Sequence, residues 1–406
     1  MPILFQINVV ANWGSTGRIA EEIGQLAMAN GWESYIAYGR GTPKSQSKLI
    51  RIGNDWDMYS HAIQTRLFDN HGLASKKTTL HLIEQIRKIN PSLIHLHNIH
   101  GYFLNYKLLF QYLSNSNIPV VWTLHDCWPI TGHCAYFMYV KCNRWINGCY
   151  KCPQISSYPQ SLFHDRSRNN YKDKKLAFNS LKRMTLVPVS DWLANLLKKS
   201  FLQKYPIRKI YNGIDLNVFN PQNKENVRIR EQLNITTQYM LLGVASVWDQ
   251  RKGLNDFTLL REKLSDKYAI VLVGLTDKQI KKLPQGIIGV ARTNSVNELA
   301  AYYTAADIFI NPTWEDNFPT TNLEALACGT PVISYRTGGS VEAIDTDTGI
   351  TVPPGDIQSL KEAIKTICGK NETYTKELCR NRAIRHYNKY ERYAEYINLY
   401  HELLET

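Results

Sequence analysis

The sequence predicts an α/β protein made of two doubly wound, Rossmann-like domains that face each other across a cleft. A chain of 406 residues exceeds the length at which one hydrophobic core ordinarily stops growing, so two domains are expected. Short apolar runs alternate with amphipathic segments along the whole chain, which is typical of parallel strands covered by helices. Turn residues at Tyr211–Pro221, YNGIDLNVFNP, separate two such series. Functional residues are therefore expected in loops beyond the carboxyl ends of the strands.

The apolar runs predict strands in both halves: Ile3–Val10, Ser34–Tyr38, Leu93–His97, Val120–Leu124 and Thr185–Val189 in the first, and Met240–Val244, Ala269–Val273, Ile287–Ala291, Ile308–Asn311 and Pro331–Ser334 in the second. Helical spacing predicts helices at Arg18–Ala29, Leu80–Ile89, Leu254–Leu264, Val296–Ala305, Thr321–Ala327, Val341–Ala343 and Ile357–Ile367. We expect an N-terminal domain over 1–211 with a Cys-rich insertion at 127–152, a C-terminal domain over 212–385, and a final helix over 386–406 that packs back on the first domain.

Composition narrows the class of protein and its partners. A hydrophobic content of 44% and a charged content of 20% are typical of a globular chain, and no apolar run approaches the roughly 18 to 20 residues of a membrane span. The start, MPILFQINVV, lacks a basic region and a cleavage site, so a cytoplasmic protein is expected. The net charge of +13 calls for an acidic partner. Basic residues concentrate in Arg166–Arg183 and Lys198–Lys209, which are either solvated helix faces or surfaces for peripheral contact with an anionic membrane. No nucleic-acid-binding signature is present.

Two loops combine glycine or positive charge with a strand-to-helix turn. Gly14 and Gly17 follow the first strand with Arg18 beside them, so backbone N–H groups there could bind an anion, although a tight structural turn explains the glycines equally well. Arg251 and Lys252 follow the strand Met240–Val244 and could hold a diphosphate, or they could be solvated cations.

The segment Trp314–Pro331, WEDNFPTTNLEALACGTP, contains a helix start and several acids. A helix beginning near Thr320–Thr321 would offer free N–H groups to an anion. Thr321 and Glu324 match a capping box, with Thr321 as the N-cap, which gives Glu324 a structural explanation. A ligand-binding Glu324 would repel a phosphate, so it would have to contact neutral hydroxyls and leave the phosphates to the backbone.

These segments together resemble glycosyltransferase family 4, whose members are retaining enzymes with the GT-B fold. The family signature, roughly Pro-Ser-x-x-Glu-Gly-Phe-Gly followed by Glu-Ala-Met-Ala-Cys-Gly-x-Pro-Val, stands here as PTWEDNFPTTNLEALACGTPV from Pro312 to Val332. Further matching blocks are NGIDLNVFNP from Asn212, RKG from Arg251, TGGSVEAI from Thr337 and PPGD from Pro353. The N-terminal half matches more loosely, through Gly14–Arg18, HLHNIHG at His95, the pair His125-Asp126 and VSDWL at Val189.

The resemblance implies transfer of a sugar from a nucleoside-diphosphate sugar to a glycan or lipid-linked acceptor, with retention of configuration and without a catalytic metal. It assigns Glu324 to the ribose hydroxyls and Asp316, eight positions earlier, to the donor sugar, which leaves Glu315 as a spectator. Backbone around Phe318, Pro319, Thr320 and Thr321, together with Arg251 and Lys252, would bind the diphosphate. His125 would contact substrate from the N-terminal domain, with His97 and His100 as weaker candidates.

Two features depart from the family signature at this site. The first acid is an Asp instead of a Glu, and Gly-Phe-Gly is replaced by Asn317-Phe318-Pro319, which removes one N–H donor. Two alternatives therefore stand beside the transferase: a non-catalytic nucleotide-sugar-binding protein and a GT-B nucleotide-sugar epimerase. A bacterial surface-polysaccharide pathway with a lipid-linked acceptor at the inner membrane face is the expected context.

Cysteines cluster in the segment that follows His125. Cys134, Cys142, Cys149 and Cys152 end in CYKCP, and a CxxC with two more cysteines nearby can form a tetrahedral thiolate site. A structural zinc is the first interpretation, with His133 as a substitute ligand. Free or redox-active thiols and disulfides are the alternatives, the last disfavoured in a cytosolic protein.

Overall fold

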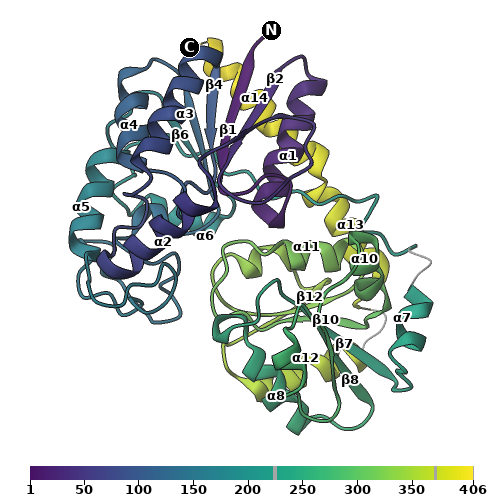
Figure 1. Ribbon diagram of the computed structural model, residues 1–406. Helices are drawn as coiled ribbons and strands as arrows, with labels where there is room; N and C mark the ends of the chain where they lie inside the picture. The colour runs from purple at the N-terminus through teal and green to yellow at the C-terminus, as the bar shows by residue number, and fades with distance from the viewer. Residues whose placement is uncertain (223–225, 370–372, 406) are drawn as a thin grey trace. The chain divides into compact units, whose positions relative to one another are not determined.

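The computed structural model describes residues 1–222, 226–369 and 373–405, with only the backbone for residues 226 and 227. The chain forms two compact units, the first of residues 1–211 and 392–406 and the second of residues 212–391. Each unit contains a six-stranded parallel sheet with helices on both faces (Figure 1). The predicted α/β class with two Rossmann-like domains is confirmed.

The sheet of the first unit has the strand order β3-β2-β1-β4-β5-β6. Its strands are β1 (Ile3–Asn8), β2 (Glu33–Tyr38), β3 (Lys48–Arg51), β4 (Leu93–Leu96), β5 (Val120–Leu124) and β6 (Met184–Pro188). The order changes direction between β1 and β4, which pair directly with Leu4 opposite Leu93. Such a switch point is where doubly wound sheets bind ligands, beyond the carboxyl ends of the strands.

Two sets of helices cover this first sheet. One face carries α1 (Gly14–Ala29) and the C-terminal helix α14 (Lys389–Glu405), whose Tyr396 and Tyr400 pack with Leu4 and Leu93. The other face packs against four helices: α3 (Lys76–Ile89), α4 (Tyr106–Asn115), α5 (Ser167–Phe178) and the short α6 (Asp191–Leu197). Helix α2 (Asp55–Phe68) and the short 3-10 helix η1 (Trp128–Ile130) belong to connections beyond the strands.

The second sheet has the order β12-β11-β10-β7-β8-β9. Its strands are β7 (Tyr239–Val244), β8 (Tyr268–Val273), β9 (Ile287–Val290), β10 (Ile308–Asn311), β11 (Val332–Tyr335) and β12 (Gly349–Val352). The helical segments are α7 (Asn226–Gln232), η2 (Gln250–Lys252), α8 (Leu254–Lys263), α9 (Asp277–Ile280), α10 (Val296–Ala305), α11 (Thr320–Ala327), η3 (Ser340–Ala343), α12 (Ile357–Gly369) and α13 (Lys376–Tyr387). Helices α8 and α12 cover one face, and α10 and α11 lie on the other (Figure 1). Counted within this unit, the strand order repeats that of the first, with the switch point between β7 and β10.

The structure differs from the predicted elements mainly at edges and short segments. The edge strands β3 and β12 were missed, because four residues reading KLIR or GITV are too short to show an alternating pattern. Strand β1 ends at Asn8 instead of Val10, α1 begins at Gly14 instead of Arg18, and the predicted helix Val341–Ala343 is the 3-10 helix η3. The predictions also missed six helices: α2, α4, α6, α7, α9 and α13. The basic stretch Lys198–Lys209, predicted to have helical spacing, instead follows the end of α6 as turns and irregular chain. Within the described part of the chain, no helix is long and apolar enough to cross a membrane.

Candidate active site

The switch point of the second unit brings together the loops that follow β7 and β10. The N–H of Trp314 donates to the carbonyl of Arg251 over 2.8 Å. Gly253 has φ +75°, and a Cβ there would lie 2.3 Å from the carbonyl oxygen of Pro312, so the RKG turn has to end in glycine. Arg251 and Lys252 are thereby held against the segment that carries Asp316.

An ion pair lies at the centre of this site. The Nζ of Lys252 is 2.5 Å from Oδ2 of Asp316, and the two side chains are 21% and 19% exposed. Burial alone would raise the pKa of Asp316, but the positive charges of Lys252 and Arg251 outweigh burial and hold that pKa below its usual value. Asp316 is therefore ionised at neutral pH, and solvent reaches the pair.

Burial separates the two adjacent acids of the segment. Glu315 is fully buried, and its carbonyl oxygen accepts a hydrogen bond of 2.9 Å from the Arg251 guanidinium. Asp316, in contrast, keeps part of its surface open. Of the two side chains, Asp316 is the one placed to meet a ligand from solvent.

A glycine pair after β11 fixes the backbone of Asp316. Gly338 has φ +52°, and a Cβ there would lie 2.0 Å from the carbonyl oxygen of Asp316. The N–H of Gly339 donates to that same oxygen over 3.1 Å. The sequence contained this Gly-Gly as a matched block, but only the structure shows that it sets the position of Asp316.

Helix α11 begins differently from the predicted capping box. Its N-cap is Pro319 in an extended conformation, and no side chain caps the helix. The fixed φ of Pro319 starts the helix at Thr320, so Thr321 lies inside the first turn and cannot serve as N-cap. The predicted capping box of Thr321 and Glu324 is therefore wrong. Glu324 is 3% exposed, and its Oε2 accepts a hydrogen bond of 2.8 Å from the Tyr303 hydroxyl of α10.

Two asparagines that the sequence interpretation missed tie this helix start to the sheet. Asn311, the last residue of β10, donates to Oδ1 of Asn322 over 2.8 Å, and the Asn322 amide donates to the Ser340 carbonyl over 2.9 Å. Phe318 is buried, and its carbonyl accepts from the Asn212 side chain at 3.3 Å. The sequence could have pointed to Asn322, because it stands two residues before the predicted ligand Glu324.

At the switch point of the first unit, a glycine-containing turn leads from β1 into α1. Gly14 has φ +62°, and α1 begins there with no acidic residue in its first turn. The carbonyl of Gly17 accepts from the N–H of Asn12 at 3.0 Å, and a Cβ on Gly17 would lie 3.0 Å from Cγ2 of Val10. Arg18 turns back and donates to the Gly14 carbonyl at 3.3 Å. Gly17 therefore has a packing role, whereas its predicted ligand contact stays a prediction.

A chain of hydrogen bonds fixes the ring of His125 beside the same switch point. Nε2 of His125 is 3.2 Å from Nδ1 of His97, whose Nε2 is 3.0 Å from Oε1 of Gln6. The Gln6 amide nitrogen donates to the Ala20 carbonyl at 2.8 Å, so Oε1 is the acceptor and His97 must donate from Nε2. A neutral His97 then accepts at Nδ1, which makes Nε2–H the donor of His125. Burial lowers the pKa of His125 to about 4 and that of His97 well below its usual value, so both rings are neutral at pH 7.

Asp126 is paired with His100. Its Oδ2 lies 2.8 Å from Nε2 of His100, whose Nδ1 is 2.9 Å from the hydroxyl of Tyr158. Burial would raise the pKa of Asp126, but the interaction with His100 lowers it below its usual value. The sequence showed His125 and Asp126 as neighbours, and the fold divides them between two hydrogen-bond networks.

The cysteine insertion contains free thiols that lie near one another. A hydrogen bond from Cys134 lowers the pKa of Cys152 to about 7, whereas burial raises that of Cys149 to about 11. Among the residues that the structure describes, no group of three or more His, Cys, Asp or Glu side chains is arranged to hold a metal ion. The predicted zinc ligands Cys134, Cys142, Cys149 and Cys152 therefore do not fit a zinc ion as arranged.

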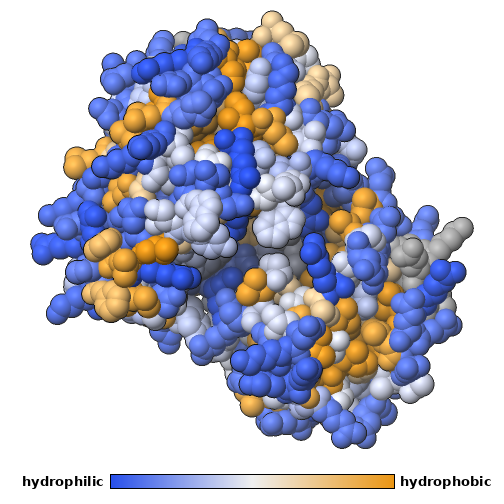
Figure 2. Space-filling model, viewed as in Figure 1, coloured by the Kyte–Doolittle hydropathy of each residue, from blue (hydrophilic) through white to orange (hydrophobic). Residues whose placement is uncertain are grey.

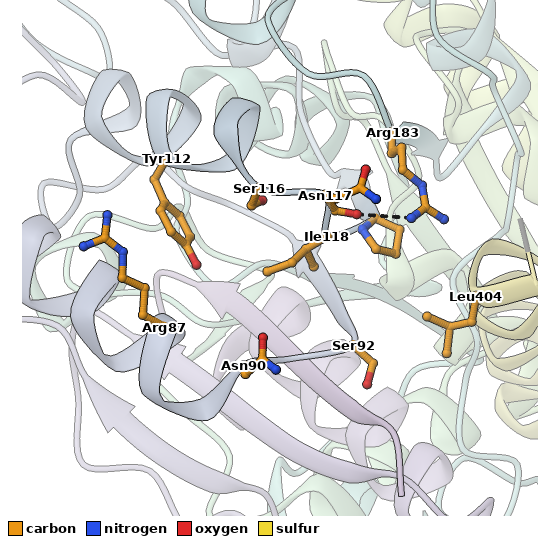
Figure 3. A pocket seen from close by; sticks show the side chains of 10 residues that line it. Arg87, Asn90, Ser92, Tyr112, Ser116, Asn117, Ile118, Arg183 and Leu404 are labelled. Atoms are coloured by element: carbon orange, nitrogen blue, oxygen red, sulfur yellow. Dashed lines mark hydrogen bonds between the residues drawn. The ribbon is translucent and has the colours of Figure 1, made fainter.

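A hollow on the surface of the first unit lies at the amino ends of its strands (Figure 3). It has a volume of about 500 Å³ and is lined by residues next to the starts of β4, β5 and β6, among them Ser92, Ile118 and Arg183. The Arg183 guanidinium donates to the Asn117 carbonyl at 3.1 Å. Because this hollow lies at the amino ends of the strands, it is separate from the switch point.

Comparisons with known proteins match both halves of the chain. Residues 16–218 match the family model described as Glycosyltransferase Family 4, and residues 238–370 match the model described as Glycosyl transferases group 1. A putative colanic acid biosynthesis glycosyl transferase of Escherichia coli, WcaC, is 24% identical over 98% of this chain and 100% of its own.

Solved structures resemble the whole chain as well. The sucrose-phosphate synthase of Thermosynechococcus elongatus superposes with a TM-score of 0.74 at 19% identity, covering 100% of both chains. HepE of Anabaena, in complex with UDP, gives a TM-score of 0.68 at 15% identity over 98% of this chain and 99% of its own.

Proposed function

The chain belongs to glycosyltransferase family 4 and has the GT-B fold, and from this premise we propose that it moves a sugar from a nucleoside-diphosphate sugar to a glycan or lipid-linked acceptor, with retention of anomeric configuration. The observation that carries the proposal is the solvent-accessible ion pair of Lys252 and Asp316 at the switch point of the second unit. Such a site combines a cation for phosphate oxygens with a carboxylate for sugar hydroxyls.

In the proposed donor site, Arg251 and Lys252 bind the diphosphate together with backbone N–H groups around Phe318–Thr321, of which Pro319 provides none. Negative charge develops on the diphosphate as the glycosidic bond breaks, and fixed positive charge beside it lowers the barrier. Asp316 accepts hydrogen bonds from the donor sugar, and Glu324 accepts from the ribose. The bond from Tyr303 supports this role, because it orients the Glu324 carboxylate independently of the helix start. HepE, solved with UDP, supports a nucleoside diphosphate as the ligand class.

The acceptor belongs to the first unit in this proposal. His125 is neutral and its tautomer is set by His97, so it can hydrogen-bond an acceptor hydroxyl without adding charge. Gly14, Gly17 and Arg18 border the same switch point, and we keep for them the predicted role of binding an anionic group of the nucleotide-sugar donor. Reaction needs no metal, because Arg251, Lys252 and the helix start supply the positive potential. Chelation by EDTA is expected to leave turnover unchanged, and a loss restored by a divalent ion would contradict this.

The name of WcaC supports a polysaccharide pathway, and we extend the proposal to a lipid-linked acceptor at the inner face of the cell membrane. A cytoplasmic enzyme would then make peripheral contact with anionic lipid, with Arg166–Arg183 and Lys198–Lys209 as the basic stretches available from the sequence. Absence of sedimentation with anionic vesicles at low salt would remove this extension.

A donor panel tests the proposed activity. Purified protein is incubated with UDP-, GDP- and ADP-sugars, and release of the nucleoside diphosphate is followed with and without glycan acceptors. We expect slow release from one donor alone and faster release with acceptor, and NMR of the product is expected to show the donor's anomeric configuration. Binding without release would identify a non-catalytic binder, and an altered sugar without acceptor would identify an epimerase.

Zinc at the four cysteines stays a prediction from the sequence. The thiols are neighbours, but their arrangement does not support a metal site. Native mass spectrometry decides between bound zinc and free thiols. A mass one zinc above the reduced chain would establish the metal, and the mass of the bare chain would exclude it.

A further inference from the structure

A basic hollow of about 820 Å³ lies between α2 and the starts of α3 and α4. Four cationic side chains line it, and Asp57 is the single carboxylate among its described lining residues: Lys76, Lys77, Lys107 and Arg166 supply the positive charge. Lys107 lies 2.9 Å from a carboxylate oxygen of Asp173, and Arg166 lies 3.5 Å from the other oxygen. Lys76 and Lys77 form no ion pair among the described residues, so the hollow has an excess of positive charge.

The start of α3 adds to this positive potential. Ser75, its N-cap, makes no capping bond, because the Ser75 hydroxyl is 2.8 Å from Nδ1 of His61 instead. The first turn contains no acid and places Lys76 and Lys77 at the hollow. An exposed cation pair at the positive end of a helix repels itself unless an anion is bound, so this part of the surface favours a phosphate-bearing ligand.

Helix α2 presents two adjacent stripes of side chains. Asp57, Ser60 and Gln64, spaced three and four residues apart, line the basic hollow. The neighbouring stripe, one residue earlier at each step, carries Trp56, Tyr59 and Ile63, which are 82%, 65% and 54% exposed.

The apolar surface continues past the end of α2. Phe68, Leu162 and Phe163 are 51%, 57% and 74% exposed. The N–H of Leu162 donates to the Arg66 carbonyl at 2.8 Å, which places the two segments side by side. We call these six residues, Trp56, Tyr59, Ile63, Phe68, Leu162 and Phe163, the α2 apolar face. Figure 2 shows apolar side chains gathered on the surface where Figure 1 places α2 and the loops beside it.

We propose that the α2 apolar face rests on an anionic bilayer and that the basic hollow beside it takes the phosphate of a lipid head group. Trp and Tyr side chains favour the boundary between water and acyl chains, and each basic residue near an anionic surface contributes about 1 kcal/mol. A free phosphate explains the lysines but leaves the six exposed apolar side chains unexplained. A protein partner explains the aromatic residues, but lysine is depleted in protein interfaces. This inference rests on the proposed function at one point only: the proposed function explains why the membrane matters, because the acceptor is a lipid or is surrounded by lipid.

Vesicle binding of the full chain tests the inference. Sedimentation at low salt compares phosphatidylcholine vesicles with vesicles that also contain phosphatidylglycerol. We expect binding to the anionic vesicles only. The double variant Lys76→Glu/Lys77→Glu and the triple variant Trp56→Ser/Tyr59→Ser/Ile63→Ser should each lose at least about tenfold in affinity. The matched control Lys281→Glu/Lys282→Glu alters the same charge on an exposed segment of the second unit and should change affinity less than about threefold.

A second measurement reports on the face itself. Vesicle binding should shift the tryptophan emission to the blue, and Trp56→Phe should remove most of that shift. Equal loss in the Lys281/Lys282 control, an unchanged shift in Trp56→Phe, or no binding by the unaltered protein would each overturn the inference. Far-UV circular dichroism and thermal melting of each variant show that it folds.

Failure of this inference is distinguishable from failure of the proposed function. Donor turnover in solution, without vesicles, does not involve Lys76 or Lys77 and should be unchanged in their double variant. Turnover without vesicle binding would reject the proposed membrane-binding surface and retain the proposed transferase activity. If the variants change vesicle binding as predicted but no donor is turned over, the proposed transferase activity is rejected and the membrane-binding surface is retained.

Discussion

The two units share one strand order, yet their switch points carry opposite chemistry. In the first unit the position beside β1 and β4 is filled by His125, His97 and Gln6, which form a neutral chain of hydrogen bonds. In the second, the position beside β7 and β10 holds the charged pair of Lys252 and Asp316. Topology therefore determines where each site lies, and the side chains delivered there determine what it can bind.

The charge difference follows from the balance between burial and counter-charge. Burial lowers the pKa of His125 to about 4, and this effect outweighs the charge of Asp126, which raises the pKa. Asp316 experiences burial as well, but Lys252 and Arg251 outweigh it and keep the carboxylate ionised. One switch point is thus suited to a neutral hydroxyl and the other to an anion.

The largest expected effect is on turnover in the charged site. Asp316→Asn should lower the rate of nucleoside-diphosphate release by about 100-fold, because it removes the sugar contact and leaves Lys252 without its partner. Glu262→Gln, an exposed change on α8, is the matched control and should retain the rate. Full activity of Asp316→Asn would overturn the choice of Asp316 over Glu315.

Glu324→Gln should weaken donor binding by about tenfold while the melting temperature changes little. The carboxylate is held by Tyr303 and has no capping role, so loss of its charge affects the ribose contact more than the helix. Thermal shift with and without donor measures both quantities. A fall in melting temperature without a change in donor affinity would make Glu324 a structural residue.

Alanine substitutions at two glycines compare the loop beside Asp316 with the turn between β1 and α1. Gly338→Ala should lower the free energy of unfolding by about 2 kcal/mol or more and reduce donor affinity, since its Cβ would meet the Asp316 carbonyl at 2.0 Å. Gly14→Ala should cost only about 1 kcal/mol, because φ is +62° but nothing lies within 4 Å of the Cβ. Urea unfolding measures both. Equal costs would mean that the Asp316 loop moves aside freely.

An effect on the pH dependence of stability is expected as well. His125 and His97 have folded-state pKa values below their unfolded values, so the unfolded chain binds more protons and stability falls as pH drops below about 6.5 toward 4. His125→Asn should remove on the order of 1–3 kcal/mol of that loss. Unfolding at a series of pH values measures it. An unchanged slope would mean that the ring is not held neutral by the fold.

The sequence predicted the fold class and the approximate position of most strands, because buried parallel strands leave continuous apolar runs. It also brought Arg251, Lys252 and Asp316 into one hypothesis through their motif. It did not reveal that Pro319 would start α11 and displace the capping box, since the motif alone fits either helix start. The His97–Gln6 chain and the contact of Gly338 with Asp316 join residues far apart in sequence, and no local pattern records such pairings.

Calorimetric titration of a nucleoside-diphosphate sugar into two variants tests most directly whether the second switch point is the donor site. Lys252→Gln removes the cation of the charged pair while keeping a hydrogen-bonding side chain, and His125→Asn alters the neutral site of the other unit. We expect Lys252→Gln to weaken donor binding at least tenfold, about 1.4 kcal/mol, and His125→Asn to leave it within about twofold. Retained affinity in Lys252→Gln with a loss in His125→Asn would contradict the assignment.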